Sequence, residues 1–129
     1  MSNSENSLSA FDAKSEAQRI AFSPMIFQAV QCLIKFKAFD VLSQTKGGCS
    51  FESLKKSTEL SAYGLNVLLE MAQTARIIYK ENEVYFLTKT GYFLANDPMT
   101  KANFAFVQDV CYQGLFYLDK SLEKGLQIG

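Results

Sequence analysis

Histidine is absent from the 129 residues of this sequence. Ser-His and Cys-His nucleophile pairs, histidine zinc sites and imidazole general bases are therefore excluded for this chain. Paired carboxylates stay open in principle, but no Asp or Glu lies in a stretch that is typical of a cleft. Gly47 and Gly48 are adjacent and precede a capping serine, so they predict a turn rather than a phosphate-binding loop. We expect no catalytic residue and no metal site in this chain.

An excess of charge of either sign is also lacking, because 13 acidic residues balance 13 basic ones. This balance argues against binding of nucleic acid or a membrane through bulk electrostatics, although a local patch stays open. The amino terminus lacks a signal-peptide pattern, and no apolar run approaches the about 20 residues of a membrane span. Cys32, Cys49 and Cys111 are odd in number and far apart, which favours a reducing compartment. Together these features predict a soluble, cytoplasmic protein of one domain.

The amino-terminal part of the sequence is expected to be helical after a polar tail. Residues 1–10 are rich in Ser and Asn and are predicted to be disordered, and a short helix is expected over 11–21. A long helix is predicted over 23–42, because its apolar residues follow the helical period. Ser23 is expected to be its N-cap, with Pro24 at the first helical position, where a missing N–H costs nothing.

A pair of capped helices followed by two strands occupies the middle of the chain. Helices are expected over 51–58 and 62–76, with Ser50 and Ser61 as their N-caps. Two β-branched and aromatic runs within 77–88, joined by a polar turn, predict a hairpin. The fold class is therefore predicted as mainly α with a small β-hairpin, in the order of a winged helix-turn-helix. The second helix is expected to bury Leu65, Leu68, Leu69 and Ala72.

The charges of this expected winged helix disfavour DNA reading. The first turns of its second helix carry no cation, and Arg76 comes only at the end. Glu81 and Glu83 at the wing tip would face phosphates, whereas the two lysines at 55–56 are typical of a solvated surface. A winged-helix transcriptional regulator is kept as the alternative function, and an enzyme that uses carboxylates alone is a remote third.

Five aromatic side chains crowd residues 103–122, which follow a short helical segment expected over 89–97. On a single long helix at about 100° per residue, they and their aliphatic neighbours form two apolar faces separated by thin polar seams. A helix of this kind needs cover on two sides. Two interpretations stay open, a central core helix or a helix that packs on a second chain or domain.

A first long helix that ends in F-D-x-L and a wing strand followed by L-T-x-x-G-x-x-L occur in this order, with the helix-turn-helix between them. With these motifs, residues 24–128 resemble the amino-terminal domain of S-adenosylmethionine-dependent O-methyltransferases of the plant caffeate, hydroxyindole and bacterial polyketide type. Lys37 stands where many relatives have a helix-breaking glycine, so a continuous first long helix is expected. The motif residues here are Phe39, Asp40, Leu42, Leu87, Thr88, Gly91 and Leu94.

The resemblance implies a dimerisation domain over 11–129 whose additional helices intertwine with a partner subunit and which does not bind DNA. In such enzymes a separate Rossmann-like domain, with an E-x-G-x-G-x-G type loop, binds the methyl donor and carries the catalytic histidine. Neither feature occurs in this sequence. The chain is therefore expected to be a fragment or a truncated form, or else a natural stand-alone module. We expect a homodimer that is inactive by itself and binds no cofactor, with S-adenosylmethionine implied for the full-length protein.

The resemblance also implies that this domain lends side chains to the acceptor pocket of the enzyme. Asp109 and Tyr112 could orient a hydroxyl acceptor and Phe116 could stack on its ring. The alternative, that these side chains belong to the core or the dimer interface, stays open. The candidate acceptor-binding residues are Met25, Phe27, Phe106, Asp109, Tyr112, Gln113 and Phe116.

Overall fold

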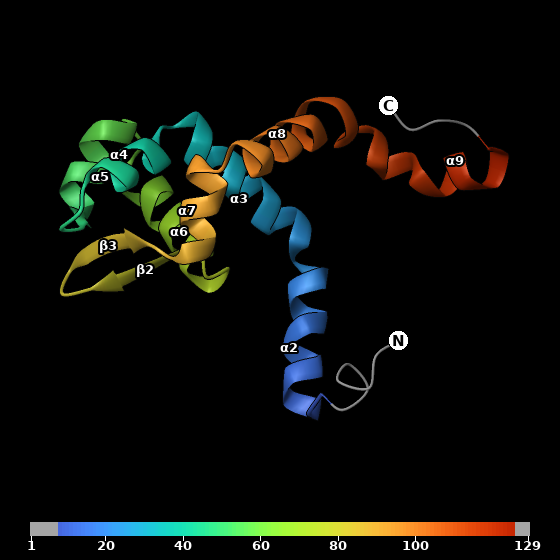
Figure 1. The fold of residues 1–129 in the computed structure, drawn as a ribbon, viewed down its shortest axis with the longest axis horizontal. Coiled ribbons are helices and arrows are strands. Elements are labelled where there is room, and N and C mark those ends of the chain that lie inside the picture. Colours follow the sequence, from blue (N-terminus) through green and yellow to red (C-terminus); the bar gives the residue numbers. More distant parts are fainter. Residues whose placement is uncertain (1–7, 126–129) are drawn as a thin grey trace.

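Helices make up most of the described residues, 8–125, in this computed structural model, and one small antiparallel sheet lies beside them (Figure 1). The predicted fold class, mainly α with a small β-hairpin, is confirmed. The predicted tail over 1–10 lies mostly outside the described residues. In chain order the elements are α2 (Ala10–Ala21), α3 (Ser23–Lys35), α4 (Ala38–Gln44), β1 (Cys49–Ser50), α5 (Phe51–Thr58), α6 (Ala62–Thr74), β2 (Ile78–Glu81), β3 (Val84–Leu87), α7 (Lys89–Asn96), α8 (Pro98–Phe106), the π-helical turn η1 (Val107–Cys111), the 3-10 turn η2 (Gly114–Tyr117) and α9 (Leu118–Lys124).

Helices α2 and α3 join almost without interruption. The prediction that Ser23 is an N-cap was wrong, because Ser23 is already helical and its hydroxyl donates to the carbonyl of Ile20 at 2.7 Å. Phe22 stands between the helices, and its N–H donates to the Gln18 carbonyl while its own carbonyl accepts from Ile26, each at 3.0 Å. The hydrogen-bond ladder therefore runs through the junction, and α2 projects from the body of the molecule (Figure 1).

The first long helix is broken at Lys37, so the prediction of a continuous helix was wrong. Helix α3 ends at Lys35, and Lys37 adopts the left-handed conformation, with φ 65° and ψ 22°. The break turns the chain so that Ala38 and Phe39 enter the core, where they are 0 % and 3 % exposed. Burial of these two side chains thus outweighs the strain at a non-glycine residue, which a sequence pattern cannot weigh.

We expect Lys37→Gly to stabilise the fold by about 0.5 to 1 kcal/mol, because glycine adopts positive φ without a Cβ clash. The free energy of unfolding from urea titration measures the gain. Lys37→Ala is the matched control, since it removes the charge and keeps the Cβ. An equal gain in both variants would show that charge, rather than backbone strain, limits stability at this position.

The helix pair and the hairpin form as the sequence predicts. Ser50 caps α5 by accepting from the Ser53 N–H at 3.1 Å, and Ser61 caps α6 by accepting from Gly64 at 3.0 Å. Strands β2 and β3 pair in antiparallel fashion with Ile78 opposite Leu87. The two-residue β1, which the sequence analysis did not predict, pairs with the other edge of β3 and gives the order β1-β3-β2.

Thr88 and Gly91 tie the end of the hairpin to the end of α6. The Thr88 hydroxyl is within donating distance of two carbonyl oxygens, that of Arg76 at 2.7 Å and that of Ile77 at 2.9 Å. The same hydroxyl accepts from the Gly91 N–H at 3.0 Å. A Cβ at position 91 would overlap the Ile77 carbonyl oxygen. The Thr-x-x-Gly part of the motif therefore has a structural role, since it caps α7 and lets its first turn approach the backbone.

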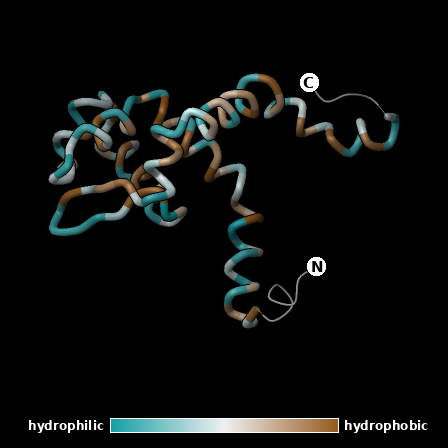
Figure 2. The backbone as a smooth tube through the Cα atoms, in the orientation of Figure 1, coloured by the Kyte–Doolittle hydropathy of each residue, from teal (hydrophilic) through white to brown (hydrophobic). Residues whose placement is uncertain are grey.

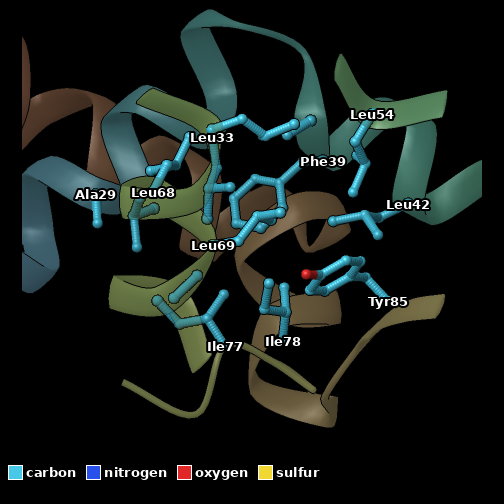
Figure 3. Packing of buried hydrophobic residues seen from close by; sticks show 14 of the residues in the cluster. Ala29, Leu33, Phe39, Leu42, Leu54, Leu68, Leu69, Ile77, Ile78 and Tyr85 are labelled. Carbon is cyan, nitrogen blue, oxygen red and sulfur yellow. The ribbon is translucent and has the colours of Figure 1, made fainter. Parts of the chain in front are cut away.

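The core lies between α3, α4, α5, α6 and the sheet (Figure 3). Figure 3 shows side chains from these elements meeting around Phe39, and the predicted buried face of α6 is confirmed. The core residues are Ala29, Val30, Leu33, Ala38, Phe39, Leu42, Cys49, Leu54, Leu65, Leu68, Leu69, Ala72, Ile77, Ile78, Tyr85 and Phe104.

The carboxy-terminal aromatic segment is not one regular helix, contrary to the sequence prediction. Asp97 caps α8 by accepting from the Thr100 N–H at 2.9 Å and its hydroxyl at 2.8 Å, and these two bonds lower the pKa of Asp97. After α8 the chain forms the π-helical turn, in which the Tyr112 N–H donates to the Val107 carbonyl at 2.7 Å. A 3-10 turn then precedes α9, which extends away from the body (Figure 1). The helical wheel of a single helix therefore fails beyond residue 106.

Candidate functional site

An apolar groove of about 520 Å³ lies between α3 and α6, and we call it the α3–α6 groove. Helix α3 supplies one wall and α6 the other, while Tyr112 closes one end beside Pro24. The groove holds no Asp, Glu, Lys or Arg side chain, so it suits an apolar occupant better than a charged one. Its lining residues are Pro24, Met25, Gln28, Ala29, Cys32, Phe36, Leu60, Gly64, Val67, Leu68, Met71 and Tyr112.

An aromatic stack fastens the carboxy-terminal segment to α3 at the end of this groove. The Phe27 ring lies between two others, with its centroid 4.1 Å from that of Phe104 and 5.0 Å from that of Tyr112. The Tyr112 hydroxyl donates to the Pro24 carbonyl at 3.1 Å. Gln28 Nε2 donates to Gln108 Oε1 at 2.9 Å. These contacts come from the end of α8, the π-helical turn and Tyr112 directly after it, and they set where the following segment leaves the body.

The predicted acceptor-binding residues divide into two groups in the structure. Met25 and Tyr112 line the α3–α6 groove, and Phe27 packs behind Tyr112. The remaining four lie outside the groove and are exposed; Phe116 has 83 % of its surface exposed and Phe106 has 58 %. The members of this second group are Phe106, Asp109, Gln113 and Phe116.

The α6 wall of the groove was not predicted from the sequence. Val67 is 39 % exposed and Met71 half-buried, although both are apolar and stand four residues apart on one helix face. That spacing was a usable signal, because it marks a second apolar stripe beside the core-facing one. Gly64 lies three residues before Val67 and lines the groove as well.

The adjacent glycines Gly47 and Gly48 do not provide a site for a nucleotide-like methyl donor. Gly48 has φ 89°, and a Cβ there would lie 2.7 Å from the side chains of Phe86 and Val84. Gly48 is therefore required by packing in the predicted turn rather than by a phosphate. Gly48 therefore does not offer S-adenosylmethionine the open backbone cradle that a glycine-rich loop between a strand and a helix provides.

Metal-binding clusters and membrane-spanning helices are both lacking in the described part of the chain. Within residues 8–125, no group of three or more His, Cys, Asp or Glu side chains is placed to hold a metal ion. In the same part of the chain, the helices are too short or too polar to cross a membrane.

A protein-family model described as the Dimerisation2-like domain matches residues 14–85, which is more than half of the chain. The chain belongs to the Dimerisation2-like domain family. The match runs from α2 to β3 and thus contains both walls of the α3–α6 groove. The resemblance to a methyltransferase dimerisation domain, which the motifs indicated, is thereby confirmed.

Solved structures share the fold of this Dimerisation2-like domain. A structure described as a pericyclic reaction enzyme matches with a TM-score of 0.73 and 18 % identity, over 95 % of this chain and 31 % of its own. The apo methyltransferase SibL gives a TM-score of 0.73 at 17 % identity, over 83 % of this chain and 32 % of its own. Human N-acetylserotonin methyltransferase gives 0.69 at 16 % identity, over 97 % and 37 %. No curated protein matched in a sequence search.

The chain thus spans about a third of the length of these solved proteins, with shares of 31 %, 32 % and 37 %. The parts of those proteins that lie outside this share have no counterpart in the 129 residues.

Proposed function

We propose that this Dimerisation2-like domain joins two copies of a S-adenosylmethionine-dependent methyltransferase and caps its acceptor pocket, and that it is inactive by itself. The family match over 14–85 carries this proposal. The fold-level likeness to SibL and to human N-acetylserotonin methyltransferase, each about three times longer than this chain, supports it. We assign S-adenosylmethionine to a separate catalytic domain of such a protein, because close packing surrounds Gly48 and Gly91 of this chain.

The capping role rests on the end of the α3–α6 groove. Met25 and Tyr112 border it, and the Tyr112 ring is held by Phe27 and by the Pro24 carbonyl, so one ring face is fixed for contact with an apolar or aromatic molecule. Asp109 and Phe116 lie on either side of Tyr112 in the sequence and are exposed, as a surface that meets another domain requires. The methyl acceptor is then a small molecule with an aromatic or apolar body.

DNA reading, the alternative function, is less well supported by the winged-helix-like order α5, α6, β2 and β3. The first turn of α6 carries no basic residue. The wing turn exposes Glu83, whose carboxylate pairs with Lys80 at 3.5 Å, so one of the few cations there is already occupied. A scaffold of this kind serves protein contact better than phosphate contact. The three free thiols, Cys32, Cys49 and Cys111, fit a cytoplasmic location.

The proposed function predicts that the purified chain is a dimer at micromolar concentration. Exposed large apolar side chains occur on α2, α7, η2 and α9, and a single copy leaves them in water. Sedimentation equilibrium over a range of loading concentrations measures the state. A monomer at every loading concentration up to about 100 μM would contradict the proposed dimerisation.

A further inference from the structure

We propose that the side-chain oxygen of Gln28 binds the methyl acceptor, and that this acceptor is an uncharged molecule that donates a hydrogen bond from a hydroxyl or N–H group. The inference rests on the capping role proposed for the end of the α3–α6 groove and names the class of molecule that the groove takes. Gln28 is not among the acceptor-binding residues expected from the sequence.

Polar groups are few in the α3–α6 groove. Of the described residues that line it, three carry an amide, hydroxyl or thiol group, namely Gln28, Cys32 and Tyr112. A thiol is a weak hydrogen-bonding group. The Tyr112 hydroxyl donates its proton to the Pro24 carbonyl at 3.1 Å. The amide of Gln28 is therefore the strongest polar group left for an occupant.

The π-helical turn fixes the orientation of the Gln28 amide. Gln28 Nε2 donates to Gln108 Oε1 at 2.9 Å, and Gln108 belongs to that turn. The nitrogen of the Gln28 amide is thus directed toward Gln108, and its oxygen is directed away from it. Figure 2 shows hydrophobic residues in both segments that meet here, α3 and the chain after α8. In such apolar surroundings a hydrogen bond is stronger than in water.

The Oε1 atom of Gln28 is free to accept a hydrogen bond. In the part of the chain that the structure describes, no hydrogen bond is made to this oxygen, and no side-chain oxygen or nitrogen is sealed off without a partner. Oε1 is therefore open to an occupant, because Gln28 is half-buried on the groove wall. Its lone pairs are unused, whereas Nε2 has already donated one proton to Gln108. An occupant that donates a hydrogen bond is thus favoured.

Two further observations define the rest of the occupant. No Asp, Glu, Lys or Arg side chain lines the groove, so a charged group would lose water there without gaining an opposite charge. The Tyr112 ring, which stacks on Phe27 at 5.0 Å between centroids, lines the groove together with Gln28. A flat apolar body against this ring, with one hydroxyl or N–H that reaches Gln28, satisfies both conditions. A neutral phenol is the simplest such molecule.

Binding of three small probes to the purified chain tests this inference. The probes para-ethylphenol, para-ethylanisole and para-ethylbenzoate share a ring and an ethyl group, but only the first donates a hydrogen bond and only the last is charged at neutral pH. Methionine methyl signals in NMR spectra report the site, because Met25 and Met71 line the groove and Met99 lies outside it. We expect para-ethylphenol to bind about three to ten times more tightly than para-ethylanisole, as one added hydrogen bond allows. We expect para-ethylbenzoate to leave the signals of Met25 and Met71 unchanged.

Substitutions separate binding by Gln28 from a merely structural role. In Gln28→Leu the preference for para-ethylphenol over para-ethylanisole is expected to be lost, while binding of para-ethylanisole shows that the groove is intact. Gln108→Leu is the matched control, because it breaks the same hydrogen bond between the two amides and leaves Gln28 Oε1 in place. This control is expected to keep the preference. Gln28→Glu, which also keeps an accepting oxygen, is expected to keep it as well.

The outcomes separate this inference from the proposed function. A preference that is lost in Gln28→Leu and kept in Gln108→Leu and Gln28→Glu supports the hydrogen bond to Gln28. Equal binding of para-ethylphenol and para-ethylanisole, equal losses in Gln28→Leu and Gln108→Leu, or tight binding of para-ethylbenzoate overturns the inference and leaves the capping role. If no probe shifts Met25 or Met71 at millimolar concentration, the inference and the capping role both fail, whereas dimerisation is measured separately by sedimentation.

Discussion

Gly91→Ala is expected to lower the free energy of unfolding by about 3 kcal/mol or more. The added Cβ would overlap the Ile77 carbonyl oxygen, which is fixed by the hydrogen bond that it accepts from the Thr88 N–H at 3.0 Å. Backbone atoms on both sides must move to relieve the overlap, so the loss is larger than for a clash with a flexible side chain. Urea titration followed by far-ultraviolet circular dichroism measures it.

Gly47→Ala is the matched control for this prediction, since no atom lies within 4 Å of a Cβ built at Gly47. Its free energy of unfolding is expected to stay within about 0.5 kcal/mol of the parent value. If Gly91→Ala were as mild as Gly47→Ala, the close approach of α7 to Ile77 would not exist as described.

Phe104→Ala is the second substitution with a large expected effect, a loss of about 3 kcal/mol in the free energy of unfolding. Phe104 is the buried residue of α8, and its ring stacks on Phe27 at 4.1 Å between centroids. Without it the contact of the carboxy-terminal segment with α3 depends mainly on Tyr112 and Gln108. The rate of amide hydrogen exchange is therefore expected to rise over residues 98–112, in addition to the fall in the free energy of unfolding.

Phe106→Ala provides the comparison, because Phe106 stands two residues away and is 58 % exposed. A change within about 0.5 kcal/mol is expected for it. Equal losses in the two variants would contradict the assignment of Phe104 as the anchor of this segment.

The parts of the fold that local signals specify were predictable from the sequence. Ser50 and Ser61 cap the helices assigned to them, and α6 buries the four residues named for it, because caps and helical period act within one or two turns. The hairpin followed from β-branched and aromatic runs on both sides of a polar turn. These features do not depend on what the rest of the chain does.

The errors occurred where distant packing decides the local backbone. The break at Lys37 depends on the burial of Ala38 and Phe39 against other elements, which outweighs the preference of lysine for a regular helix. The break after Phe106 depends on contacts of Gln108 and Tyr112 with α3, about 80 residues earlier in the chain. Ser23 is not an N-cap because the helical hydrogen bonds continue through Phe22 and place Ser23 inside α3.

The candidate site was predictable in part. Met25, Phe27 and Tyr112 were named from a resemblance, and the structure brings these three together. Phe106, Asp109, Gln113 and Phe116 were named from the same resemblance, and they do not line the groove. The α6 wall was not predicted because only the buried face of α6 was taken from the helical period. Val67 and Met71 form a second apolar stripe beside that face. The role of Met25, Phe27 and Tyr112 toward an acceptor stays a prediction.

The π-helical turn between Val107 and Cys111 has a consequence for how this segment can change over evolutionary time. A π turn is an α-helix with one residue inserted, and one residue corresponds to a rotation of about 100°. Loss of a single codon in this turn would rotate every later side chain about the segment axis, without altering Phe104 or the core. The segment could thus present a new surface in one genetic step, while the core of the fold stays the same.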